Sequence, residues 1–166
     1  LSRRRLMESL ATALNPAMPG PSWQQPEAVP ERSTLPSCRI LLVEDLEDNR
    51  DVIALFLRET SYQLDMAENG AVALQKFQTS TYDLVLMDMQ MPVMDGLQAT
   101  MVMRQWEREQ QRRPTPIVAL TANAFKEESE KSLGAGCTAH LTKPIKKKTL
   151  LAAITHYANA PAERAA

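Results

Sequence analysis

Long apolar runs and an excess of charge of one sign are both missing from this 166-residue sequence. No apolar run approaches the roughly 18 residues that cross a bilayer, and no segment has the pattern of a secretory signal peptide. With 19 basic and 20 acidic residues the formal net charge is -1. This balance gives no reason to expect nucleic acid or an anionic membrane as a partner. We therefore expect a cytoplasmic protein that has no nucleic-acid or membrane contact through this part of its chain.

Cysteine is scarce as well. Only Cys38 and Cys137 are present, too few for a disulfide framework, and they flank the first and the last of the strands predicted below. Those strands are not neighbours in the expected sheet. We predict two buried or half-buried free thiols, which suit a reducing cytoplasm.

The first 37 residues are predicted to lie outside the main folded domain. Residues 1–14 have apolar residues at helical spacing, and residues 145–158 repeat the pattern, so we interpret 1–14 as the last helix of a preceding, related domain. Residues 15–37 contain six of the eleven prolines and form an extended linker. Residues 161–166 are expected to be a disordered tail. Because the chain begins with Leu1 rather than Met, we expect it to be part of a longer protein.

From residue 38 to about 160, strand patterns alternate with helix patterns. Strands are predicted at Arg39–Val43, Gln63–Ala67, Leu84–Met87, Ile117–Leu120 and Ala139–Thr142. Helices are predicted at Asp48–Thr60, Ala71–Gln78, Asp95 to about Gln111, Phe125–Leu133 (closed by Gly134 or Gly136) and Lys146–Tyr157. Five such units imply an α/β fold, a doubly wound parallel sheet with right-handed crossovers and helices on both faces.

The central segment runs from Leu84 to Gly96, and its apolar strand is followed at once by the carboxylate of Asp88. A loop follows, stiffened by Pro92 and turned by Asp95-Gly96. The carboxyl end of a buried strand is where open α/β sheets bind their ligands. Taken alone, Asp88 is better explained as a solvated residue at a strand end or as a helix cap.

Polar residues also follow three other predicted strands, and this changes the interpretation of Asp88. Glu44 and Asp45 follow the first strand, Thr121 the fourth and Lys143 the fifth. In a parallel sheet these strand ends lie along one edge, where three crowded carboxylates are unfavourable unless a cation lies among them. Oxygen ligands of this kind suit Mg²⁺, and a hydroxyl with an ammonium completes a site for a doubly charged tetrahedral group.

The segments ILLVED, DLVLMDMQMPVMDG, PIVALTA and HLTKPI together resemble the receiver (response-regulator) domain of two-component signalling, especially the receivers attached to hybrid sensor histidine kinases. The resemblance covers residues 38–158. It implies a flavodoxin-like (βα)5 sheet of strand order 2-1-3-4-5, the order of the chemotaxis receiver. It also suggests that residues 1–14 end a preceding receiver-like domain.

The resemblance also implies roles for single residues. Its phosphoacceptor is Asp88, its magnesium ligands are Glu44, Asp45, Asp88 and the backbone carbonyl of Gln90, and its phosphoryl-binding groups are Thr121 and Lys143. The bond before Pro144 is commonly cis in the family. One departure is Glu44, because many members have Asp there. The extra methylene should be tolerated, since many other members have Glu, but it could shift the affinity for the metal.

The switch of the family involves Thr121 and an aromatic residue on the fifth strand, which turns inward on phosphorylation. The matching position is His140, three residues before Lys143. Two interpretations stay open for His140. It is either a switch whose ionisation couples output to pH, or a partly exposed strand residue with no role.

The function that the resemblance implies is phosphoryl transfer from a phosphohistidine donor (a histidine kinase or a phosphotransfer domain) onto Asp88 with Mg²⁺, followed by a change in partner contacts. A homodimer through the fourth helix, fifth strand and fifth helix is a further expectation. Such a domain catalyses only its own phosphorylation and dephosphorylation, and the longer protein would be a hybrid histidine kinase. The alternatives are a stand-alone regulator, a receiver that only binds partners, and a Mg²⁺-dependent phosphohydrolase with an Asp nucleophile. The last requires an acidic residue two positions after Asp88, where Gln90 stands.

Overall fold

The computed structural model describes residues 38–122 and 126–158. The predicted helix at 1–14, the linker at 15–37 and the tail at 161–166 lie outside these ranges.

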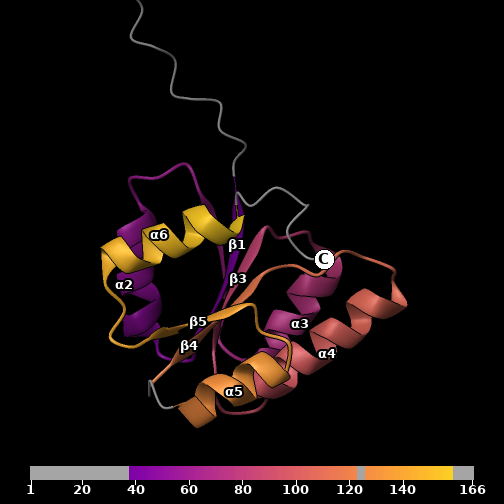
Figure 1. Ribbon diagram of the computed structural model, residues 1–166. Coiled ribbons are helices and arrows are strands. Elements are labelled where there is room, and N and C mark those ends of the chain that lie inside the picture. The colour runs from indigo at the N-terminus through magenta and orange to yellow at the C-terminus, as the bar shows by residue number, and fades with distance from the viewer. Residues whose placement is uncertain (1–37, 123–125, 159–166) are drawn as a thin grey trace, which may run out of the picture. The chain divides into compact units, whose positions relative to one another are not determined.

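A single parallel sheet forms the centre of the described domain (Figure 1). Its strands are β1 (Arg39–Val43), β2 (Gln63–Ala67), β3 (Leu84–Asp88), β4 (Ile117–Thr121) and β5 (Ala139–Thr142). Their order is β2-β1-β3-β4-β5, and all four pairings are parallel. The predicted flavodoxin-like fold and strand order are confirmed.

In the described residues four helices connect the strands and a fifth follows β5. They are α2 (Glu47–Leu57), α3 (Gly70–Thr79), α4 (Gly96–Glu109), α5 (Lys126–Gly134) and α6 (Lys147–Ala158). Figure 1 shows α2 and α6 on one face of the sheet and α3 and α4 on the other. The fold is therefore doubly wound, as right-handed crossovers on both sides require.

Strand residues divide between the two faces because successive side chains of a strand point in opposite directions. On β3, Leu84 and Leu86 pack with Ile53 of α2 and Ile154 of α6. The alternate β3 residues pack against α3 and α4, and this second cluster contains Val85, Met87, Phe77, Ala99 and Met103. Both faces of β3 and β4 are buried, which is why these strands are continuous apolar runs.

The helix ends differ from the predicted ones by a few residues, and local hydrogen bonds explain the differences. Helix α2 is predicted to end at Thr60 but ends at Leu57, whose carbonyl accepts from the hydroxyl of Thr60 at 2.6 Å and from the backbone amide of Thr60 at 2.9 Å. Asn69 and Asp95 accept hydrogen bonds from the third residue of α3 and α4 respectively, so each caps its helix.

Helix α5 ends in a Schellman motif at Gly136. The Cys137 amide donates to the carbonyl of Ser132, and the Gly136 amide donates to the carbonyl of Leu133, both at 3.0 Å. Gly136 has φ +107°, which favours glycine, and a Cβ there would meet the side chain of Arg104. Of the two candidate glycines, Gly136 therefore closes this helix.

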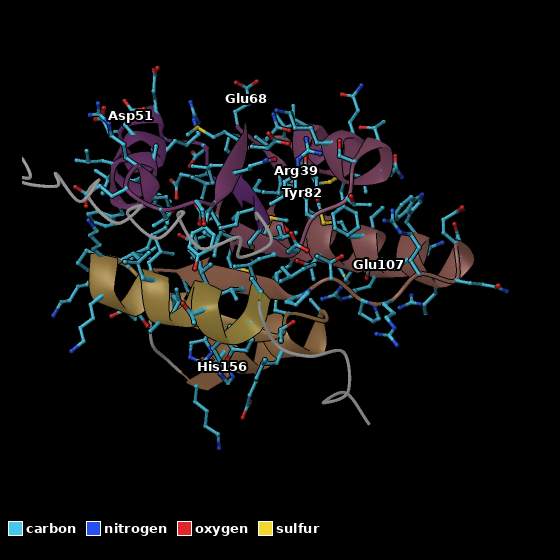
Figure 2. All side chains as sticks on the ribbon, turned by 90° about the horizontal axis from the view of Figure 1, so that it is seen from above. Arg39, Asp51, Glu68, Tyr82, Glu107 and His156 are labelled. Atoms are coloured by element: carbon cyan, nitrogen blue, oxygen red, sulfur yellow. The ribbon has the colours of Figure 1, made fainter. Side chains whose placement is uncertain are left out.

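Two clusters of polar side chains lie away from the carboxyl edge of the sheet. Figure 2 shows Arg39 and Tyr82 beside each other, with the guanidinium carbon 5.1 Å from the centre of the ring. Both side chains donate to the same carboxylate oxygen of Asp65, at 2.7 and 2.8 Å. On α4, Glu107 is buried and accepts from Arg104 at 2.6 Å and from the backbone amide of Thr115 at 2.7 Å. A buried carboxylate with such partners is not left unsatisfied.

Both cysteines are buried free thiols, as predicted. Burial raises the pKa of Cys38 to about 11, with a smaller contribution from the carboxylate of Asp83. Burial raises the pKa of Cys137 too. Among the described residues no helix has the length and hydrophobicity that a membrane span needs.

Prediction for the thiols. In the folded protein at neutral pH, both thiols should react with a maleimide roughly a hundredfold more slowly than an exposed cysteine, because the thiolate is scarce and shielded. In denaturant both should react at once. Intact mass against time measures this. Immediate labelling of either thiol in the folded protein would contradict the burial described here.

Candidate functional site

The carboxyl ends of four strands converge on one group of polar side chains. Glu44 directly follows β1, Asp88 is the last residue of β3, Thr121 is the last residue of β4, and Lys143 directly follows β5. Glu44 is 0% exposed, Asp88 is 4% exposed, and Thr121 is also buried. The strand order brings together residues up to 99 positions apart, so the site exists only in the folded sheet.

Three carboxylates share this site. Glu44, Asp45 and Asp88 each offer an oxygen, and these oxygens lie within 4.8 Å of one another. Asp45 is half-buried, whereas the other two carboxylates are buried. Like charges so close raise each other's free energy, so the cluster requires positive charge nearby.

Lys143 supplies part of that charge. Its ammonium donates to Oε2 of Glu44 at 2.7 Å and to Oδ2 of Asp88 at 2.9 Å. Burial alone would lower the pKa of Lys143, but hydrogen bonds and attraction from Glu44 and Asp88 outweigh it and raise this pKa. One ammonium therefore bridges two buried carboxylates and stays charged at neutral pH.

The pKa of Asp88 is raised above its ordinary value of 3.8. Burial is the largest cause, and the negative charge of Glu44 acts in the same direction. Hydrogen bonds from Lys143 and from the backbone amide of Gln90, which lies 3.1 Å from Oδ1, oppose the shift. Its two oxygens are thus held by two donors, which fixes the direction in which the carboxylate points.

The donor set fits a hard divalent cation. It consists of carboxylate oxygens from three residues, and the Lys143 ammonium neutralises only one of their three charges. Oxygen-rich, net-negative sites of this kind are typical of Mg²⁺ and Ca²⁺ rather than of softer metals. The site contains the three predicted carboxylates together, and the amide of Gln90 is beside them.

Sequence reasoning missed two residues from the first turns of α2. Asn49 donates from Nδ2 to Oε1 of Glu44 at 2.8 Å. Arg50 donates from one nitrogen to the backbone carbonyls of Glu44 and Asp45, at 2.7 and 2.9 Å. The only sequence signal was their place just after the acidic pair, at the start of a helix that packs on the same edge.

The loop from β3 to α4 is held tightly against the site. A Cβ on Gly96 would collide with the backbone oxygen of Asp88 and with Met89, so only glycine fits there. Val93 has φ 70° and is 84% exposed, a strained backbone for a β-branched residue. The loop therefore presents an apolar side chain to solvent.

A cavity of about 500 Å³ opens beside Lys143 between α2 and the loop after β5. Its wall combines polar and apolar side chains, among them Glu44, Asn49, Val52, Lys143, Pro144 and Ile145. The Lys143–Pro144 bond is cis, as the resemblance implies. The Lys143 amide donates to the carbonyl of Thr121 at 2.7 Å, so the last strand end is tied to its neighbour.

His140 lies outside this group of residues. It is exposed on β5, and its Nε2 is 3.1 Å from the hydroxyl of Ser129 on α5. The arrangement fits both interpretations of this histidine, so its role as a switch stays a prediction.

The family model that describes the response regulator receiver domain matches residues 40–155. The sensor histidine kinase GacS of Pseudomonas protegens is 44% identical over 112 residues, which are 68% of this chain and 12% of that protein. Hybrid signal transduction histidine kinase G of Dictyostelium discoideum is 42% identical over 121 residues, 72% of this chain and 4% of that protein. The chain therefore spans only a small part of these relatives.

Solved structures show the same fold. The receiver domain of sensor histidine kinase PA1611 from Pseudomonas aeruginosa, with a magnesium ion in its active site cleft, has TM-score 0.67 and 35% identity over 75% of this chain and 99% of that one. A second structure contains the receiver domain of Ssk1 from Saccharomyces cerevisiae in complex with the histidine phosphotransfer protein Ypd1. It matches with TM-score 0.72 and 32% identity, over 74% of this chain and 90% of that one.

Prediction for the buried carboxylate. Asp88→Asn should raise the free energy of unfolding at pH 7, without divalent cations, by on the order of 1 kcal/mol. The folded pKa of Asp88 exceeds 3.8, so its ionisation opposes folding, and wild-type stability falls as the pH rises from below 3.8 through the folded pKa. The advantage of the variant should shrink as the pH falls toward 3.8.

Urea denaturation at several pH values, with a chelator present, measures the difference. The control is Asp51→Asn, since Asp51 is an exposed carboxylate on α2, and it should show no such pH-dependent gain. A variant at Asp88 that is less stable than wild type at pH 7 would contradict the cause assigned to the shift.

Proposed function

Because the chain belongs to the response regulator receiver domain family, we propose that Asp88 accepts a phosphoryl group from a phosphohistidine donor in a Mg²⁺-dependent reaction. The observation that supports this most is the placement of Asp88, with its two oxygens held by Lys143 and by the amide of Gln90. A nucleophile fixed in this way needs little reorganisation before it attacks.

The transfer is a displacement at phosphorus. One oxygen of Asp88 forms a bond to phosphorus as the bond between phosphorus and the donor's imidazole nitrogen breaks, and that nitrogen keeps the electron pair. The Lys143 ammonium, 2.9 Å from Asp88, turns to the phosphoryl oxygens as their charge approaches it. The hydroxyl of Thr121 binds the same group. Catalysis of this kind depends on positioning and electrostatics rather than on an acid or base.

We assign the cation to Glu44, Asp45, Asp88 and the backbone carbonyl of Gln90. When bound, Mg²⁺ would neutralise the charge that phosphoryl oxygens bring to a cluster already rich in carboxylates. The mutual proximity of the three carboxylates supports this, and so does the magnesium ion reported in the receiver of PA1611.

We further propose that the donor docks on α2 and the adjoining cavity. Leu46, Val52 and Leu55 on or just before α2 are exposed, and Leu55 is 61% exposed. Apolar side chains grouped beside an active site are typical of a contact surface. The complex of Ssk1 with Ypd1 shows that a related receiver pairs with a phosphotransfer protein.

The longer protein that we propose is a hybrid sensor histidine kinase, since GacS is named a sensor histidine kinase and the Dictyostelium protein a hybrid signal transduction histidine kinase. A cytoplasmic location agrees with the two free thiols. The stand-alone regulator stays the alternative. The phosphohydrolase is disfavoured because Gln90 cannot serve as a proton donor to a leaving group. The homodimer through α5, β5 and α6 stays a prediction.

Prediction for phosphorylation. Incubation with Mg²⁺ and acetyl phosphate should add the mass of one phosphoryl group to the wild-type chain, and Asp88→Asn should abolish this gain. Lys143→Ala should slow it by roughly a hundredfold or more, because an electrostatic contact made in the transition state is lost. Intact mass spectrometry measures both, with Asp51→Asn as the matched control that retains the gain. Labelling that persists in Asp88→Asn would refute the assignment.

Prediction for docking. Leu55→Asp should slow transfer from phosphorylated Ypd1 by roughly tenfold or more, since a charge replaces an apolar contact at the interface. The rate with acetyl phosphate, which needs no docking surface, should stay the same. The control is Met101→Asp, an equally drastic change at an exposed residue of α4. If Leu55→Asp slows both donors alike, or neither, the surface is wrongly assigned.

A further inference from the structure

Glu44 is the most enclosed carboxylate of the site, and both of its oxygens are engaged. Glu44 is 0% exposed. Oε2 accepts from Lys143 at 2.7 Å, and Oε1 accepts from the side-chain amide of Asn49 at 2.8 Å. A buried ionised group needs such donors on each oxygen, because an unpaired one costs free energy. Asn49 is therefore part of what keeps this charge in place.

We propose that Asn49 is a positioning residue, which holds the Glu44 carboxylate so that its remaining lone pairs face the cation while Oε2 stays on Lys143. The inference rests on the proposed function of the site and adds to it a residue from α2. It also explains how the longer side chain of Glu44 can be fixed at a position where an Asp would be shorter by one methylene.

Because the side chain of Glu44 is longer than that of an aspartate, its carboxylate needs a further contact to fix its position. Glutamate has one more rotatable bond than aspartate, so its carboxylate explores more positions unless something fixes it. The ammonium of Lys143 attracts Glu44 but, as a compact charge on a flexible stem, imposes little direction. The planar amide of Asn49 imposes direction, because it approaches from a helix that is itself fixed on the sheet through Ile53 and Leu57.

Asn49 and its neighbour Arg50 contact different parts of the acidic pair. Arg50 holds the backbone carbonyls of Glu44 and Asp45, at 2.7 and 2.9 Å. Asn49, in contrast, donates to the side chain of Glu44 and not to the backbone of the acidic pair. Loss of the Asn49 amide should consequently leave the backbone of the acidic pair in place and free only the carboxylate. Asn49 lies in the wall of the cavity beside Lys143, so the substitution of Asn49 alters the site itself.

A double-mutant cycle on the full chain tests this. Asn49→Ala should raise the dissociation constant for Mg²⁺ roughly tenfold or more, the usual effect of removing a group that orients a metal ligand. Glu44→Asp withdraws the carboxylate from the reach of Asn49. In that background Asn49→Ala should change the dissociation constant by less than about twofold, so the two effects are not additive.

The readouts are Mg²⁺ titration of the unphosphorylated chain by NMR and the rate of phosphorylation from acetyl phosphate at saturating Mg²⁺. The control is Asp51→Ala, which gains helix propensity much as Asn49→Ala does. Figure 2 shows Asp51 on α2 at the outside of the molecule, and it is exposed. This control should leave the affinity for Mg²⁺ unchanged.

Three outcomes would overturn the inference. The wild type does not bind Mg²⁺, or Asn49→Ala leaves the affinity for Mg²⁺ unchanged, or Asn49→Ala changes the dissociation constant by the same factor with Glu44 and with Asp at position 44. The last result would mean that Asn49 acts only through the helix. Failure of the proposed function is a separate result. In that case wild type binds Mg²⁺ but takes no phosphoryl group from acetyl phosphate, while the cycle still reports on Asn49.

Discussion

The structure of the site depends on one ammonium group shared by two buried carboxylates. Lys143 lies 2.7 Å from Glu44 and 2.9 Å from Asp88, although these residues come from three different strand ends. Without Lys143, burying both carboxylates would cost several kcal/mol, since an unpaired charge in a protein interior is expensive. With it, two of the three negative charges of the site remain uncompensated, and this residual charge supports the proposed cation site.

The sheet makes that arrangement possible. Because β1, β3, β4 and β5 are parallel and adjacent in the order β1-β3-β4-β5, all their carboxyl ends lie at one edge. The apolar clusters on both faces hold the strands in register, and the polar contacts at the edge can then be short without deforming them. Crowding at this edge is visible in the raised pKa of Asp88, which results mainly from burial and secondly from the charge of Glu44.

Much of this could be predicted from the sequence. The runs ILLV, LVLM and IVAL are apolar because both faces of their strands are buried, so the strands were predictable from the pattern. The strand order came from the resemblance to receiver domains. A parallel sheet in turn predicted the convergence of the polar strand ends, namely Glu44, Asp45, Asp88, Thr121 and Lys143. Asn49 and Arg50 were not, because polar residues in the first turns of a helix usually face solvent and no periodic pattern marks the exceptions. The end of α2 at Leu57 was missed because the amide and hydroxyl of Thr60 turn back to the Leu57 carbonyl, and apolar periodicity does not record such contacts.

A crystal structure of the chain with Mg²⁺ and beryllium fluoride, an analogue of the phosphoryl group, tests the central claim most directly. The account predicts the analogue bonded to one oxygen of Asp88, a cation among the oxygens of Glu44, Asp45 and Asp88, and the Lys143 ammonium in contact with a fluorine. An analogue bonded to another residue, or a cation away from these three carboxylates, would contradict it.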